Sequence, residues 1–376
     1  MIYLDYSATT CPRKEVIDVF SKVSTEYFAN SNSLHILGIK SHQLENYATK
    51  EIAKYLNVKE NEIIYTSSSS ESNNLALKGV CFKYKNRGNH IITTKLEHSS
   101  ITETCKYLES IGYKVDYAKL NDDGTVDIND LKNKITNNTI LISIAAIDSE
   151  LGIKQPIEEI GQLIKQYPKC IFHVDCTQAI GKVKIDFSNV DLASISAHKI
   201  YGLKGIGMLI KKENIELIPL IHGGKSTTIY RSGTPALGLI LSIKKALELI
   251  INDIDTNYKH VEKLNNIITK KLEKYPNIYI NSTSKSIKHI INISINGIKP
   301  ETFIHALEEN EIYVSTKSAC SKIDSISNSI YELTHDENRA KSSIRISLSY
   351  LTTEEEINIF LNVFDKCYQK LMLGNK

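Results

Sequence analysis

Lys199 lies in a segment whose neighbouring side chains suit imine chemistry with a cofactor. The segment, 196–205, reads SAHKIYGLKG, follows a predicted buried strand and ends in a turn that contains two glycines. The Lys199 amine could form an imine with a cofactor aldehyde, Ser196 and His198 could hold a phosphate, and the glycines allow a sharp turn. Pyridoxal phosphate is the cofactor that needs this arrangement. Most lysines are solvated surface charges, so this interpretation depends on the rest of the chain.

A run of hydroxyl side chains, 66–74 (TSSSSESNN), lies between a predicted strand and the predicted helix LALKGVCFKY. Small hydroxyl residues at a helix N-terminus offer backbone N–H groups, hydroxyl donors and the positive end of the helix dipole, which together bind phosphate. Ser69 and Ser70 are the candidates for this task. An ordinary serine-rich helix cap would have the same sequence pattern.

Two more polar clusters follow predicted strands. Asp175 ends the strand CIFHVD and Gln178 follows three residues later, while His98 comes after the strand HIITT in the string KLEHSS. An acid at that strand end could pair with a protonated pyridine nitrogen and keep the ring an electron sink. A histidine could stack on the ring or move protons near neutral pH. Taken alone, Asp175 would be a helix cap and His98 a surface histidine.

The elements that must position these residues alternate along the chain. From about residue 60 to 210, apolar strand-like runs alternate with helix-length amphipathic segments, which is typical of an α/β domain with a largely parallel sheet. In such sheets the ligand sits at the carboxyl ends of the strands, where the polar clusters fall. The seven predicted strands are 62–67, 90–94, 114–120, 140–147, 170–175, 191–197 and 205–212.

Two domains are predicted, because the 376 residues exceed what one compact core usually holds. Residues 15–255 form the large α/β domain, and residues 1–14 together with 256–376 form a smaller α+β domain. A long helical stretch after Pro235 runs toward Lys274 and links the two. Thr353 and Glu356 form a capping box that opens the last helix.

Composition excludes several classes of function. With 41% hydrophobic residues, 24% charged residues and a net charge of +3, the chain is typical of a globular protein, and we expect no direct DNA binding. The N-terminus MIYLDYSATT is unlike a signal peptide, and no apolar run reaches the roughly 18 residues that span a bilayer. We therefore expect a cytoplasmic protein without membrane contact. Its seven scattered cysteines predict neither disulfides nor a metal site.

Ten short strings in sequence order carry a resemblance to a known family. They are YLDYSATT (3–10), SLHILG (33–38), TSSSSESNNLAL (66–77), EHSS (97–100), ELG (150–152), HVDCTQ (173–178), SAHKIYGLKGIG (196–207), HGG and RSGT (222–234), SAC (318–320) and SSIRISLSYLTTEEEI (342–357). By these strings the chain resembles the NifS/IscS-like cysteine desulfurases, pyridoxal-phosphate enzymes of the class V aminotransferase type, over nearly its whole length. The resemblance implies the type I fold of pyridoxal-phosphate-dependent transferases, with a mostly parallel seven-stranded sheet in the large domain.

The resemblance also implies roles for the candidate residues. Lys199 would carry pyridoxal 5′-phosphate and later move protons, and His98 would stack on the ring. Asp175 would meet the ring nitrogen and Gln178 the ring hydroxyl. Arg345 would clamp the substrate carboxylate, a task suited to the forked guanidinium. The phosphate would be held by Ser69, Ser70, Ser196 and His198, with Thr234 supplied by the second subunit of a homodimer.

Cys320 is the residue that decides the predicted reaction. Sulfur transfer needs a thiol that attacks the substrate's sulfur and keeps it as a persulfide, which an ordinary aminotransferase does not need. A cysteine in the string SAC is by itself most often a small buried hydrophobe. Here it lies in the polar string STKSACSKIDSISNS, where Lys317 or Lys322 could favour its thiolate. The spacing from Cys320 to Arg345 resembles the long-loop branch of the family, which delivers sulfur to acceptor proteins.

Several positions depart from the family pattern. Ser149 stands where the family usually has an asparagine that touches cofactor and substrate, and its shorter side chain could weaken the orientation of the substrate. Ser68 replaces a glycine of the phosphate loop, Leu203 replaces a proline, and 227–229 (TTI) replace a Glu-Arg-Gly-type stretch. These changes keep open a second reading, a paralogue that has drifted in activity and acts mainly as a partner-binding protein.

The sequence therefore predicts a homodimeric cysteine desulfurase that converts L-cysteine to L-alanine and leaves the sulfur on Cys320 as a persulfide. A sulfur-acceptor protein would take it for iron–sulfur cluster assembly or for the thiolation of tRNA or thiamine, and the sequence does not name that acceptor. A selenocysteine lyase or another class V pyridoxal-phosphate lyase is the alternative enzyme. An enzyme is favoured over a partner-binding paralogue, because the chain retains all five of Lys199, Asp175, His98, Arg345 and Cys320.

Overall fold

A seven-stranded sheet forms the centre of the computed structural model, which describes residues 1–316 and 326–374. In spatial order its strands are β2 (Ile63–Thr66), β8 (Gly207–Lys211), β7 (Leu192–Ser196), β6 (Ile171–Asp175), β5 (Thr139–Ala145), β3 (His90–Thr93) and β4 (Lys114–Tyr117). Among these described strands, β8 alone runs antiparallel to its neighbours. The predicted mostly parallel sheet is confirmed, and β5 begins one residue earlier than expected.

The two faces of this sheet enter two separate hydrophobic clusters, because successive residues of a strand point to opposite sides. Ile64, Ile91 and Leu141 pack into the cluster of α3 (Ser69–Lys83) and α4 (Ser99–Ser110). Ile63, Ile92 and Ile142, each next to one of these residues, pack into the cluster on the other face. That second cluster includes side chains of α1 (Lys14–Glu26), α2 (Ile36–Leu56), α5 (Ile128–Lys134), α6 (Ile157–Ile164) and α7 (Leu237–Ile250). Coverage of both faces explains why the strands are apolar almost throughout.

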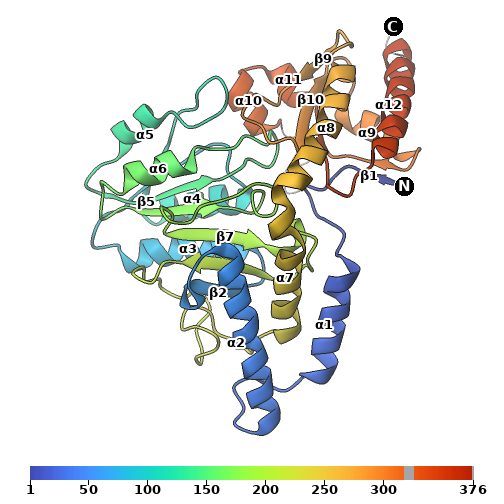
Figure 1. The fold of residues 1–376 in the computed structure, drawn as a ribbon. Helices are drawn as coiled ribbons and strands as arrows, with labels where there is room; N and C mark the ends of the chain where they lie inside the picture. The colour runs from blue at the N-terminus through green and yellow to red at the C-terminus, as the bar shows by residue number, and fades with distance from the viewer. Residues whose placement is uncertain (317–325, 375–376) are drawn as a thin grey trace.

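A smaller antiparallel sheet has a hydrophobic cluster of its own. Its strands lie in the order β12 (Ser343–Ser347), β10 (Ile290–Ile295) and β9 (Ile278–Ile280), and they pack with α8 (Ile254–Leu272), α9 (Pro300–Glu308) and α12 (Glu354–Gly374). The N-terminal strand β1 (Ile2–Tyr3) pairs in parallel with β11 (Ile312–Tyr313), so the first residues of the chain lie beside this second sheet (Figure 1). Two short helices, α10 (Asn328–Thr334) and α11 (Glu337–Lys341), lead into β12.

Two local predictions can be compared with the structure, the capping box of the last helix and the long helical stretch after Pro235. The capping box of α12 is present, since Thr353 N donates to Glu356 Oε2 at 2.8 Å and Glu356 N donates to Thr353 Oγ1 at 3.1 Å. The long helical stretch after Pro235 is interrupted by a 3-10 turn, η3 (Ile251–Asp253), which separates α7 from α8. Asn252 and Asp253 are weak helix formers because their side chains compete for backbone hydrogen bonds. No helix in the described part of the chain is both long and apolar enough to cross a membrane.

Candidate active site

A cavity of about 190 Å³ lies at the carboxyl ends of β5, β6 and β7, beside the start of α3 and the strand β12. We call it the site cavity. The predicted site residues that line it are Ser69, Ser70, His98, Ser149, Asp175, Gln178, His198, Lys199 and Arg345. Further lining residues are Ser7, Ala8, Ser68, Leu96, Ala145, Ile147 and Thr177. The structure therefore brings together side chains that are scattered over most of the sequence.

Three predicted site residues do not line this cavity. Ser196 is the last residue of β7 and is 1% exposed, and its Oγ has no hydrogen-bond partner among the described residues. Thr234 is exposed on the segment that precedes α7, so this chain does not bring it to its own cavity. Cys320 lies outside the described residues, as do Lys317 and Lys322.

Lys199 reaches the cavity from η2 (Ala197–Lys199), a 3-10 turn that directly follows β7. Its Nζ donates to the carbonyl oxygen of Ala8 at 2.8 Å and also to that of Ser7. The turn predicted from the glycines is present, because Gly205 adopts a φ of 88°. A Cβ at Gly207 would lie 2.9 Å from the Cα of Ser68, so the glycine lets β8 pass close to the start of α3.

Asp175 ends β6 and presents a carboxylate that is fixed by its neighbours. Its Oδ2 accepts from Asn73 Nδ2 at 2.8 Å, and its Oδ1 accepts from Thr177 N at 2.9 Å and from the Thr177 hydroxyl. The side chain is almost buried yet lines the cavity. A protonated ring nitrogen placed here would meet a carboxylate whose orientation is already set.

His98 is connected to Asp175 through two residues of neighbouring helices. Asn73 Nδ2 also donates to Ser100 Oγ at 2.8 Å, and Ser100 Oγ lies 2.8 Å from His98 Nδ1. The backbone N–H of Ser100 donates to the same Nδ1 at 3.1 Å, so the proton of the neutral ring lies on Nε2. Burial lowers the pKa of His98, which keeps the imidazole neutral at pH 7.

The start of α3 offers groups that could hold an anion. Ser68 is its N-cap, with Oγ accepting from Glu71 N at 3.4 Å, so the serine that departs from the family pattern caps the helix. The amides of the first turn, which contains Ser69 and Ser70, have no acceptor within the helix. His198 faces them with its Nδ1 3.1 Å from Thr9 Oγ1, and burial, with help from Lys199, lowers the pKa of His198 to about 4.

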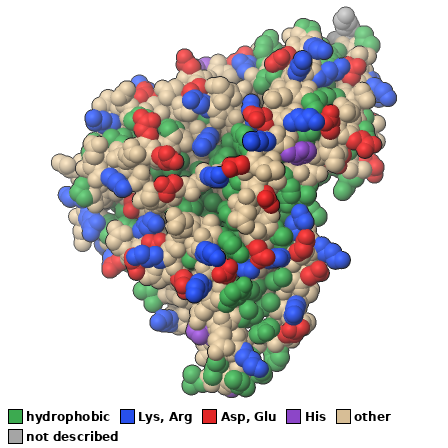
Figure 2. All heavy atoms as spheres, in the orientation of Figure 1, with side chains coloured by type: hydrophobic (Ala, Val, Ile, Leu, Met, Phe, Trp, Pro, Cys, Tyr) green, Lys and Arg blue, Asp and Glu red, His purple; other side chains and the backbone are tan. Residues whose placement is uncertain are grey.

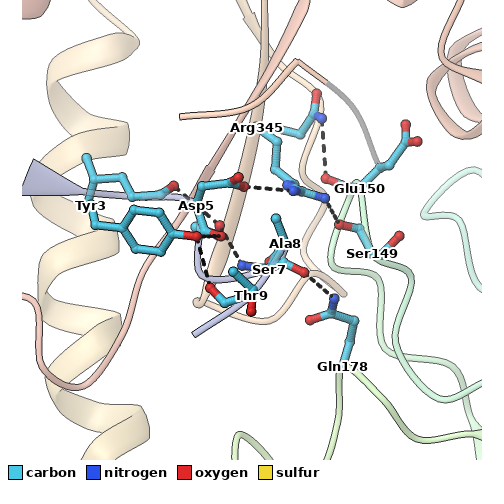
Figure 3. A network of polar contacts seen from close by, with 12 residues as sticks. Tyr3, Asp5, Ser7, Ala8, Thr9, Ser149, Glu150, Gln178 and Arg345 are labelled. Atoms are coloured by element: carbon cyan, nitrogen blue, oxygen red, sulfur yellow. Dashed lines mark hydrogen bonds and ion pairs between the residues drawn. The ribbon is translucent and has the colours of Figure 1, made fainter. Parts of the chain in front are cut away.

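Arg345 enters the cavity from β12 and is 1% exposed. Its Nη2 forms an ion pair with Asp5 Oδ1 at 2.8 Å, and its Nη1 donates to the carbonyl oxygen of Ser149 at 3.0 Å (Figure 3). Its Nε is buried and has no partner among the described residues. A buried N–H without a partner is costly, so this guanidinium still has the capacity to bind a carboxylate.

The turn that presents Ser149 contains two buried acids. Asp148 Oδ2 accepts from Glu150 N at 3.1 Å, which closes the turn, and Ser329 Oγ donates weakly to its Oδ1 at 3.4 Å. Burial, together with repulsion from Glu150, raises the pKa of Asp148 to about 7. Glu150 in turn accepts from the Ser327 hydroxyl. The side chain of Ser149 itself lines the cavity.

Sequence reasoning missed the residues that support the site from behind. The carbonyl oxygens of Ser7 and Ala8 hold Lys199, and Asp5 holds Arg345. All three lie in the string YLDYSATT, which marked the resemblance but received no role. Asn73 and Ser100 were inside quoted strings as well. The hydroxyl and amide side chains in those strings were the available signal. Only the fold shows that Asn73 and Ser100 contact each other.

The described residues fit pyridoxal 5′-phosphate on grounds of their own chemistry. Lys199 could attach to the aldehyde, Asp175 could meet the ring nitrogen, and the start of α3 could bind the phosphate. The Oγ of Ser196, two residues before His198 in the chain, is a buried hydroxyl without a partner among the described residues. A bound phosphate would supply one.

Known proteins resemble this chain over nearly its whole length. The aminotransferase class V family matches residues 2–360. The chain is 38% identical over 372 residues to cysteine desulfurase IscS of Clostridium botulinum (strain Kyoto / Type A2), covering 97% of this chain and 94% of that protein. It is 39% identical over 380 residues to a NifS/IcsS protein homolog of Lactobacillus delbrueckii subsp. bulgaricus, covering 98% and 97%.

Solved structures agree with these sequence relatives. A structure described as a NifS-like protein superposes with a TM-score of 0.92 at 32% identity and covers 99% of each chain. Another, described as SspA in complex with cysteine, superposes with a TM-score of 0.83 at 31% identity and covers 94% of this chain and 100% of that one. The fold is therefore shared with solved proteins.

Proposed function

This chain belongs to the class V aminotransferase family and is an enzyme of its cysteine desulfurase group, and from this premise we propose how its residues act. The site cavity holds pyridoxal 5′-phosphate, and the reaction takes the sulfur from L-cysteine and releases L-alanine. The observation that carries this proposal is the meeting of Lys199, Asp175 and Arg345 in one cavity. The Lys199 amine suits the cofactor aldehyde, and the Asp175 carboxylate suits the ring nitrogen. The Arg345 guanidinium suits the carboxylate of an amino acid.

The bound cofactor supplies an electron sink for the carbon that carries the substrate's amino group. Lys199 Nζ would hold the cofactor and would move the proton at that carbon. Asp175 would meet the ring nitrogen, and His98, with its proton on Nε2, would stack on the ring. Gln178 would form a hydrogen bond with the ring hydroxyl. Ser69, Ser70, Ser196 and His198 hold the phosphate.

Arg345 and Ser149 orient the substrate in this proposal. The unpartnered Nε of Arg345 supports the role, because a carboxylate would give it an acceptor. Asp5 holds the guanidinium in place from the other side. We call Arg345, Asp5 and Ser149 the substrate end of the cavity, and Lys199, Asp175, His98 and the start of α3 the cofactor end.

Cys320 accepts the sulfur in this proposal, although it lies outside the described residues. Its thiolate bonds to the substrate sulfur as the carbon–sulfur bond breaks, and the electrons of that bond remain with the carbon, which is then protonated to give alanine. Support comes from the described residues on either side of 317–325. Ser315 N donates to Arg345 O at 3.1 Å, and Ser327 donates to Glu150, so both flanks meet the substrate end.

A homodimer is also proposed, with Thr234 reaching the phosphate of the partner's site. Hydrophobic side chains gather on the outside of the molecule around the lower end of α2 (Figure 2), where Phe28 is 75% exposed, Leu34 94% and Ile36 64%. Ile229, five residues before Thr234, is 67% exposed. Apolar patches of this kind mark protein contacts.

The domain division stays a proposal, with residues 15–255 in the large domain and residues 1–14 and 256–376 in the small one. It is supported by two sheets with separate hydrophobic clusters.

The acceptor is proposed to be a protein of iron–sulfur cluster assembly or of tRNA or thiamine thiolation. It takes the outer sulfur of the Cys320 persulfide. The site gives no observation that favours the partner-binding paralogue or the selenocysteine lyase over the desulfurase. Long polar sequence around Cys320 supports delivery to a protein rather than release of free sulfide.

The test uses purified full-length protein loaded with pyridoxal 5′-phosphate. We expect a visible absorption band that Lys199→Ala abolishes, one alanine formed per sulfur transferred, and 32 Da of added mass on Cys320 after incubation with cysteine. Cys320→Ser should keep the band and lose both the persulfide and alanine formation. A wild-type protein that stays colourless at saturating cofactor, or a Cys320→Ser variant with an unchanged rate, would contradict the proposal.

A further inference from the structure

Lys182 is a buried cation next to the site that the proposed reaction does not use. It lies seven residues after Asp175 in the chain and is 8% exposed. Its Nζ donates to Gln178 Oε1 at 2.6 Å, and the described residues offer it no carboxylate. Burial, reinforced by the charges of Lys199 and Arg345, lowers the pKa of Lys182 to about 7. Burying a lysine amine without a carboxylate partner is unfavourable, so the contact between Lys182 and Gln178 calls for an explanation.

The orientation of the Gln178 amide is settled by the chemistry of its two partners. Gln178 Nε2 donates to the carbonyl oxygen of Ser7 at 2.9 Å, a contact drawn in Figure 3. The Ser7 carbonyl oxygen can only accept, and Lys182 in its protonated form can only donate. Exchanging the amide oxygen and nitrogen would therefore break both contacts at once. Lys182 and Ser7 together fix which end of the amide is the donor.

This orientation decides what Gln178 offers to the cavity that it lines. Its oxygen is occupied by Lys182, and one of its two N–H groups is occupied by Ser7, which also accepts from Lys199. The remaining N–H is the hydrogen-bond donor left for a ligand. Gln178 consequently faces the cavity as a hydrogen-bond donor, and a neighbouring cation polarises the amide and strengthens that donor.

We propose that Lys182 is a positioning residue that acts through Gln178, holding its amide so that an N–H points to the ring oxygen of the bound cofactor. The inference rests on the proposed function, because it presumes that pyridoxal 5′-phosphate occupies the site cavity. Lys182 would thereby join the residues of the proposed site without contacting the cofactor. On its other side Lys182 borders an open groove with Lys154, Lys184, Lys259 and Lys285, and with the acids Asp255 and Glu262. His289 lies close enough for Lys182 to lower the pKa of its ring.

The experiment follows the visible absorption of the cofactor-loaded protein across pH. Protonation of the chromophore adds a positive charge, which a nearby cation and an N–H donor to the ring oxygen both oppose. Lys182→Met should therefore raise the pH midpoint of the spectral change by about half a unit or more. Lys182→Gln keeps an N–H donor for Gln178 and should shift the midpoint less. Lys184→Met, at an exposed lysine paired with Asp255, is the matched control and should leave it unchanged.

A double variant separates action through Gln178 from a direct effect of charge. In a Gln178→Ala background, Lys182→Met should produce little further shift, because the amide that it orients is gone. An equal shift in both backgrounds, or an unchanged midpoint in Lys182→Met, would overturn the inference while leaving the desulfurase proposal intact. A wild-type protein with no absorption band would overturn both. Thermal unfolding of each variant checks its folding, and methionine at this buried position should not reduce stability.

Discussion

The two ends of the site cavity are built in different ways. At the cofactor end, Asp175 ends a strand of the seven-stranded sheet, and Lys199 and His98 follow closely after two other strands of that sheet. At the substrate end, Arg345 comes from the second sheet and Asp5 from the N-terminal segment, and they meet the turn that carries Ser149. One end is thus a single sheet edge, whereas the other is a meeting of three distant segments. The difference implies that the two ends can be damaged separately.

Arg345→Ala should give the largest effect that is confined to one end. The variant loses the proposed carboxylate contact and leaves Asp5 without its ion-pair partner. Two hydrogen bonds to a charged group correspond to roughly a 1000-fold loss of kcat/KM for cysteine. The Kd for pyridoxal 5′-phosphate should stay within about threefold, because the cofactor end is untouched. Steady-state kinetics and a cofactor titration measure the two quantities.

Arg339→Ala is the matched control for this variant. Arg339 donates to Asn281 in the same smaller sheet region and does not line the cavity. Its removal should leave kcat/KM close to the wild-type value. If Arg345→Ala weakened cofactor binding as much as catalysis, the two ends would act as one unit and the comparison would fail.

Asn73→Ala should damage the cofactor end instead. Asn73 donates to both Asp175 and Ser100, so its loss frees the carboxylate and the residue that holds His98. Losing a hydrogen bond to a charged group costs about 1.5 kcal/mol or more, which predicts a roughly tenfold higher Kd for the cofactor. Asn89→Ala, which removes an exposed contact to Gly112, should leave the Kd unchanged. A cofactor Kd that does not move would show that Asp175 needs no such support.

Ser149→Asn tests the departure from the family pattern at the substrate end. The longer amide would reach further into the cavity that Ser149 lines, and it could contact the substrate carboxylate beside Arg345. We expect KM for cysteine to fall about threefold, as one added neutral hydrogen bond allows, with the cofactor spectrum unchanged. An unaltered KM would mean that the serine is no handicap.

The same contrast explains what could be predicted from sequence. Lys199, Asp175 and the serines of α3 were identifiable because each follows an apolar strand, and parallel strands bring such positions to one edge. Arg345 was placed by resemblance, since nothing local says what a strand of a second sheet will meet. Asp5 and the Ser7 carbonyl escaped notice because their roles depend on tertiary contacts between segments more than 170 residues apart. Backbone carbonyls carry no side-chain signature at all.

Asp148→Asn should produce the smallest effect, visible in how stability at the substrate end depends on pH. Burial raises the pKa of Asp148 to about 7, so between pH 4 and 7 the folded protein binds more protons here than the unfolded chain does. The free energy of unfolding therefore falls as pH rises through this window. Asparagine carries no charge and can still accept from Glu150 N, so it removes that loss.

The melting temperature of Asp148→Asn should match the wild type at pH 4 and exceed it by about 2–4 °C at pH 8. Asp122→Asn, at an exposed acid on another loop, should show the same difference from wild type at both pH values. A constant offset for Asp148→Asn across pH would mean that the carboxyl is already ionised at pH 4 in the folded protein. In that case Asp148 would be a charged support for the turn that carries Ser149 at the substrate end.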